Sequence, residues 1–218
     1  MSCYPKNDYG GYLQIAVQNS SNPPAKWFHQ PESEVLNAPL IVRAGGSFTW
    51  PPPPPLKVNA IRRLVLIGGG VGINPFQSIV REMMLKRGSK NDQTYSLEQV
   101  KVLYATKAVS PIRSEQILFI NELLEGLNDL TYRPHGEFKL LLTGVSSEDV
   151  KDAKGLPVNT SIGRITEKDL LEALGDENDR EGTVVYVCGP PTMTDTFVQY
   201  LGAQKGMTPQ RVLCEKWW

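Results

Sequence analysis

Residues 63–75 read RLVLIGGGVGINP, and this stretch decides the fold. Its first part, Arg63 to Ile67, is almost entirely apolar, as is typical of a strand that is buried on both faces of a parallel sheet. Three glycines follow at once and another stands at position 72, so the chain can turn sharply without a Cβ in the way. Pro75 suits the first turn of a helix. The stretch therefore predicts a strand, a glycine turn and a helix in that order.

The rest of the chain repeats this order. After the glycine turn, Phe76, Ile79, Val80, Met83 and Met84 recur at the spacing of one helix face. Further apolar runs predict strands at 100–104, 138–142, 183–188 and 211–214, separated by helical patterns and, after residue 142, by a polar loop that ends near Gly163. Alternating strands and helices predict the α/β class with a doubly wound parallel sheet of five strands.

The first 55 residues have a different pattern. Residues 12–18 alternate apolar and polar side chains, which predicts a half-buried strand, and residues 40–43 predict another. Between them, residues 23–29 suit a short helix entered through proline. The run Pro51 to Pro55 can form neither a helix interior nor a central strand. We expect a rigid connector there, or else a ligand for an aromatic groove, and predict domains at 1–55 and 56–218.

Composition excludes several classes of protein. Lys and Arg total 23 and Asp and Glu total 23, so no net charge attracts nucleic acid or an anionic membrane. No apolar run approaches the roughly 18 residues of a membrane span. The three cysteines, Cys3, Cys188 and Cys214, are too scattered for a disulfide framework or a zinc site, and His29 and His135 lack further metal ligands nearby. The first residues also show neither a signal core nor an amphipathic leader.

The glycine turn has the chemistry of a phosphate site. Backbone N–H groups and the positive end of the following helix dipole both favour an anion, and the missing side chains let it approach. The stretch departs from the GxGxxG fingerprint, and a tight turn without a ligand is the alternative. The candidate ligand-binding residues here are Gly69, Gly70, Val71, Gly72, Ile73 and Asn74.

A second turn follows the strand predicted at 183–188. Its sequence runs from Cys188 through Gly189 and Pro190 to Met193, and a helix is expected next. Ligands of such sheets bind beyond the carboxyl ends of the strands, where this turn lies. The Cys188 thiol could contact a nicotinamide ring. It could equally be a small packing residue, because buried cysteines often are.

These two turns, in this order and about 120 residues apart, resemble the NAD(P)-binding domain of the ferredoxin-NADP reductase superfamily. Its members carry a "GGxGIxP" loop, a "CGPxxM" turn and an aromatic residue near the C-terminus, which correspond here to 69–75, 188–193 and 217–218. The resemblance extends over residues 56–218. Asn74-Pro75, the stretch 163–166 and the ending 215–218 are most similar to the oxidoreductase NAD-binding domain-containing proteins.

The resemblance implies an oxidoreductase that passes a hydride from NAD(P)H to a flavin, and electrons onward to an unidentified acceptor. It implies nucleotide contacts at the first turn and at Gly189, Pro190 and Met193, and a reacting end formed by Cys188, Glu215 and Trp218. Alternatively, the terminal tryptophans only cover the end of the sheet. The subfamily resemblance alone favours NAD over NADP. No acidic residue ends the strand at 100–104 to bind a ribose 2′-hydroxyl, and Lys107 could either suit a 2′-phosphate or face solvent. The resemblance also suggests a mitochondrial location.

The first 50 residues resemble the second half of that superfamily's antiparallel flavin barrel, at 25–29 and 44–48. The superfamily's Arg-x-Tyr-Ser/Thr flavin motif is missing, because no arginine here has a tyrosine two positions later. We therefore expect a partial barrel that holds FAD weakly or not at all. Two non-catalytic alternatives follow, namely an NAD(P)-binding sensor and a scaffold whose proline run binds a partner.

Overall fold

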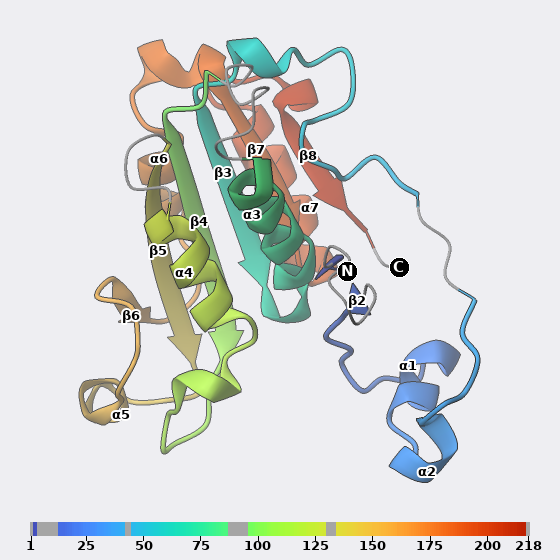
Figure 1. The fold of residues 1–218 in the computed structure, drawn as a ribbon. Helices are drawn as coiled ribbons and strands as arrows, with labels where there is room; N and C mark the ends of the chain where they lie inside the picture. Colours follow the sequence, from blue (N-terminus) through green and yellow to red (C-terminus); the bar gives the residue numbers. More distant parts are fainter. Residues whose placement is uncertain (1, 4–12, 42–44, 87–95, 130–133, 217–218) are drawn as a thin grey trace.

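The computed structural model describes residues 2–3, 13–41, 45–86, 96–129 and 134–216, and a parallel six-stranded sheet is its centre (Figure 1). The strands lie in the order β6-β5-β4-β3-β7-β8. Their bounds are β3 (Arg63–Gly69), β4 (Gln99–Lys107), β5 (His135–Thr143), β6 (Thr160–Ile162), β7 (Thr183–Cys188) and β8 (Val212–Glu215). The predicted α/β class and doubly wound parallel sheet are confirmed.

The sheet has one strand more than the five predicted. The additional strand, β6, lies in the expected polar loop and pairs with β5 only from Leu140 to Leu142. It has three residues, none of them fully buried. So short an edge strand needs no continuous apolar run, and a hydrophobic pattern therefore gives no sign of it.

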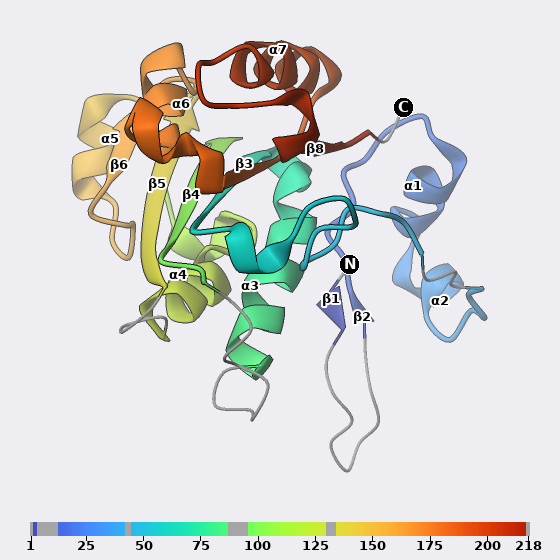
Figure 2. The same ribbon diagram turned by 90° about the horizontal axis from the view of Figure 1, so that it is seen from above.

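Helices cover both faces of the sheet, and Figure 2 shows the resulting three layers. On one face lie α3 (Asn74–Lys86) and α4 (Ile120–Asp129), packed on alternate strand residues such as Leu64 and Leu66. On the other lie α6 (Glu167–Leu174) and α7 (Pro191–Gly202), packed on the intervening residues Val65 and Ile67. The shorter elements are α5 (Ser147–Asp152), η1 (Val58–Ala60), η2 (Gly70–Ile73), η4 (Ser114–Gln116), η5 (Glu177–Gly182) and η6 (Pro209–Arg211).

The N-terminal segment differs from the barrel that we expected. Its strands in the described residues are β1 (Ser2–Cys3) and β2 (Leu13–Gln14), which form an antiparallel pair. The predicted helix is confirmed as α1 (Pro23–Phe28), and α2 (Glu32–Val35) follows it. No barrel is seen among the described residues of this segment. The predicted strand at 40–43 is not formed at 40–41, and its remainder lies outside the described residues.

The residues just before the proline run pack on the sheet. Trp50 is buried in the core beside α3, and the Phe48 ring contacts the rings of Phe76 and Tyr186. The Tyr186 hydroxyl donates a hydrogen bond of 2.6 Å to the carbonyl of Thr49. Burial raises the pKa of Tyr186 well above its ordinary value, so this donor keeps its proton. The domain boundary at 55/56 stays a prediction.

Candidate functional site

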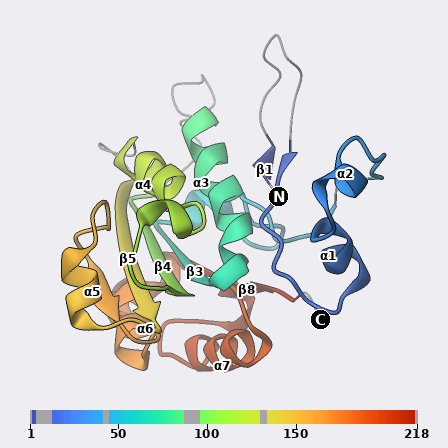
Figure 3. The same cartoon turned by 90° about the horizontal axis from the view of Figure 1, so that it is seen from below.

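The connections of the sheet diverge between β3 and β7. From β3 the chain moves to β4, β5 and β6 on one side, and then returns to β7 and β8 on the other. At the carboxyl edge, which Figure 3 views from below, β3 leads into η2 and α3 on one face, whereas β7 leads into α7 on the opposite face. Such a switch point is where open α/β sheets bind ligands. Both predicted turns lie there, because Gly68 pairs directly with Cys188.

The two turns touch each other backbone to backbone. A Cβ added at Gly72 would lie 2.2 Å from the carbonyl oxygen of Cys188 and 2.7 Å from the nitrogen of Gly189. One added at Gly189 would lie 3.1 Å from the Cα of Gly69. The missing side chain of Gly72 therefore allows the contact between the turns, because the β7 backbone fills the space where a Cβ would lie. A nucleotide contact of Gly72 stays a prediction.

Gly70 is the position at which the turn leaves open space. Its φ is +54°, in the left-handed region that favours glycine, and an added Cβ would have no atom of the described residues within 4 Å. Gly70 and Val71 are half-buried, whereas the glycines on either side are buried. The amino ends of α3 and α7 both lie at this edge, so two helix dipoles present their positive ends beside the open space. This arrangement suits an anion such as a phosphate.

The second turn is held in place by its own side chains. The hydroxyl of Thr194, which is fully buried, donates a hydrogen bond of 3.2 Å to the carbonyl of Gly189. An added Cβ at Gly69 would lie 2.8 Å from both the Met193 sulfur and Pro190 Cδ. Met193 and Pro190 therefore cover the end of β3. The structure brings both to the glycine turn, and their contact with a nucleotide stays a prediction.

Two residues of the predicted nucleotide set point into the protein. Ile73 is completely buried in the core beside α3. Asn74 is 6% exposed, and its side-chain amide is hydrogen bonded to the backbone of Ala16 and Val71. Any nucleotide contact of these two residues would have to come from their backbone.

The structure brings together two of the three residues that were predicted to form the reacting end of the site. Cys188 ends β7 and pairs with Glu215, which ends β8, so the structure brings these two residues side by side. The Cys188 side chain is completely buried among the apolar residues beside α3, which favours the packing interpretation. Glu215 is half-buried. Trp218 lies outside the described residues, and the catalytic roles of all three stay predictions.

A feature that the sequence did not reveal lies at the end of β4. A cavity of about 320 Å³ is lined there by Lys107, Arg113 and Gln116, among others. Within the described part of the chain, neither cation forms an ion pair. Lys107 ends the strand next to β3, so the cavity lies on the same edge of the sheet as the glycine turn. Arg113 was missed because it lies in the loop beyond the strand, where no periodic pattern indicates that it folds back.

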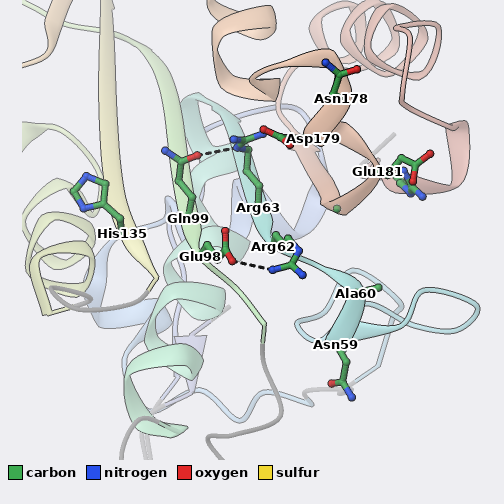
Figure 4. A pocket seen from close by; sticks show the side chains of 12 residues that line it. Asn59, Ala60, Arg62, Arg63, Glu98, Gln99, His135, Asn178, Asp179 and Glu181 are labelled. Atoms are coloured by element: carbon green, nitrogen blue, oxygen red, sulfur yellow. Dashed lines mark hydrogen bonds and ion pairs between the residues drawn. The ribbon is translucent and has the colours of Figure 1, made fainter.

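A larger cavity, of about 770 Å³, lies at the opposite, amino edge of the sheet (Figure 4). Its arginines bond to neighbouring side chains or to the backbone. Arg62 pairs with Glu98 at 2.8 Å, whereas Arg63 donates to the Gln99 side chain at 2.8 Å and to the carbonyl of Leu174 at 2.6 Å. These bonds join β3, β4 and the end of α6. The cavity therefore lies where polar contacts join these three elements, at the edge of the sheet opposite to the two glycine turns.

The described residues contain no group of three or more His, Cys, Asp or Glu side chains that could hold a metal ion. None of the helices formed by these residues has the length and apolar character needed to cross a membrane.

Comparison with known proteins gives matches over most of the chain. The model of a family described as "Oxidoreductase NAD-binding domain" matches residues 66–199. Oxidoreductase NAD-binding domain-containing protein 1 of Bos taurus is 35% identical over 210 residues, which are 94% of this chain and 60% of that protein. NADH-cytochrome b5 reductase 1 of Cryptococcus neoformans is 27% identical over 174 residues, 76% of this chain and 48% of that protein. The chain thus spans about 60% of the length of the first of these relatives.

A solved structure shares the fold. The flavohemoglobin of Malassezia yamatoensis, determined with bound FAD and heme, superposes with a TM-score of 0.50 at 19% sequence identity. The match covers 73% of this chain and 33% of the flavohemoglobin chain. At this level of identity the likeness concerns the fold alone.

Proposed function

The chain belongs to the oxidoreductase NAD-binding domain family, and from this premise we propose that it is the nucleotide-binding part of an NAD(P)H-dependent oxidoreductase. One observation carries the proposal. Two glycine turns touch at the switch point of the sheet, two helices begin there, and the open space at Gly70 lies at the same place. We place the pyrophosphate at Gly70 and Val71, and the nicotinamide toward the ends of β7 and β8.

The protein's contribution in this proposal is binding and orientation. NAD(P)H supplies the hydride, while the backbone N–H groups of the glycine turn hold its phosphates and thereby direct the nicotinamide toward the edge of β7. Glu215 has a carboxylate at that edge, and we assign it the exchange of a proton with the electron acceptor.

The acceptor that we propose is a flavin, as the family resemblance suggests. In the described N-terminal residues no barrel is seen, and neither α1 nor α2 contains a buried residue. We therefore assign flavin contacts to no residue of this chain. The same observation favours a second candidate function, an NAD(P)-binding module that transfers no hydride.

One observation favours NADH as the substrate and another favours NADPH. One relative is by name an NADH-dependent reductase, which favours NADH. The cavity with Lys107 and Arg113 would favour the 2′-phosphate of NADPH, because both side chains are cationic. We propose that NADH is the main substrate and that NADPH also binds.

Anaerobic flavin reduction tests the proposed function. Purified chain is mixed with excess FAD and either NADH or NADPH, and the flavin absorbance is followed with time. We expect bleaching that requires the protein and is faster with NADH. Glu215→Gln should slow it at least about tenfold at unchanged NADH affinity, since only a proton donor is lost.

The matched control is Glu181→Gln, at the opposite edge of the sheet, which should leave both quantities unchanged. NADH binding without any bleaching would reject the oxidoreductase and leave the nucleotide-binding module. Absence of both binding and bleaching would reject the two candidates together.

A further inference from the structure

The side chain of Asn74 replaces a strand partner for the N-terminal segment. Its Oδ1 accepts a hydrogen bond of 2.8 Å from the backbone N–H of Ala16, and its Nδ2 donates one of 3.0 Å to the carbonyl of the same residue. Ala16 lies two residues beyond β2 and 58 positions away from Asn74 in sequence. In an antiparallel sheet, two residues exchange both of their backbone bonds in this way.

The residue type explains the geometry. In an extended chain the N–H and C=O of one residue point to the same side, and a primary amide presents a matching acceptor and donor. Aspartate would lose the donors, and the single oxygen of threonine could not span both groups. At 6% exposure the amide is shielded from water, so its bonds do not compete with solvent.

The second hydrogen of the amide reaches the glycine turn. Nδ2 also donates to the carbonyl of Val71 at 2.8 Å, so one side chain joins Ala16 to the turn. On the other side, Nε2 of His29, at the end of α1, lies 3.0 Å from the carbonyl of Val17. The contacts thus run from the glycine turn through Asn74 and residues 16–17 to α1.

We propose that Asn74 is a positioning residue that couples nucleotide binding at the glycine turn to the placement of residues 13–17. A ligand that orders Val71 also orders the Asn74 amide, and through it Ala16. By linkage, fixing Ala16 strengthens nucleotide binding by the same factor. The coupling rests on the proposed function, whereas the contact between Asn74 and Ala16 does not.

Hydrogen exchange of the full chain tests the proposal, read by mass spectrometry on peptides that cover residues 13–18. Without nucleotide, Asn74→Ala should speed exchange of the Ala16 amide about tenfold, because its acceptor is gone. Saturating NADH should slow exchange there in the wild type and have no effect in Asn74→Ala. A purely structural role would not produce this response to NADH.

Two further variants keep the test decisive. Asn74→Asp retains an acceptor for the Ala16 N–H but turns a carboxylate toward the carbonyls of Ala16 and Val71, so it should recover only part of the protection that Asn74→Ala loses without nucleotide. Asn22→Ala is the matched control, because Asn22 is exposed and its side chain does not cap α1. Wild-type exchange at Ala16 in Asn74→Ala would overturn the proposal. If NADH does not bind the wild type, the proposed function is rejected. The comparison of wild type and Asn74→Ala without nucleotide still tests the contact between Asn74 and Ala16.

Discussion

Gly72→Ala is expected to lower the free energy of unfolding by about 3 kcal/mol or more. The added Cβ would lie 2.2 Å from the carbonyl oxygen and 2.5 Å from the carbonyl carbon of Cys188. Both atoms belong to the backbone of β7 and cannot rotate away as a flexible side chain would. The two turns would therefore have to separate, which disturbs the centre of the sheet. Urea denaturation, followed by circular dichroism, measures the effect.

Gly45→Ala is the control for this substitution. An added Cβ at Gly45 would have no atom of the described part of the chain within 4 Å, so stability should change by no more than about 0.5 kcal/mol. Equal denaturation midpoints for the Gly72 variant and the wild type would contradict the close contact between the turns.

Gly70→Asp is expected to weaken NADH binding about 100-fold or more while the chain stays folded. Aspartate tolerates the left-handed backbone that Gly70 adopts, and its side chain would enter open space. A carboxylate about 4 Å from a phosphate is repelled by about 4 kcal/mol at an effective dielectric constant of 20, more than the roughly 2.7 kcal/mol that a 100-fold loss requires. Fluorescence titration with NADH measures the affinity.

Gly70→Asn distinguishes the effect of the added charge from that of the added side-chain volume, because asparagine has nearly the same size as aspartate and also tolerates this backbone. We expect it to weaken binding by only about tenfold, so that most of the aspartate effect is electrostatic. Equal affinities of the two variants would show that no anion lies beside Gly70.

The sequence predicted the sheet well wherever strands are buried on both faces. β3 and β7 are continuous apolar runs because helices cover both of their sides. The start of α6 also has a local signal in the sequence, because Thr166 and Asp169 have the spacing of a capping box and exchange hydrogen bonds in the structure. β6 was missed because three partly exposed residues have no detectable period.

The sequence could not predict contacts between distant segments. The alternation at 12–18 predicts a strand, but among the described residues 13–18 only Leu13–Gln14 form one, and Ala16 pairs with a side chain. Likewise, no local pattern distinguishes a glycine that faces a ligand from one that faces backbone. Gly70 and Gly72 look alike in the motif, and only the positions of β7 and α3 give them different surroundings.

We expect the dinucleotide to bind at the glycine turn and not in the larger cavity at the amino edge. Backbone amide chemical shifts of the 24.2 kDa chain, recorded by NMR during titration with NADH, test it most directly. We expect saturable shift changes at residues 69–73, 188–189 and 192–193, with none at Arg63 or Gln99. Changes confined to Arg63, Gln99 and the other residues around the amino-edge cavity would contradict it.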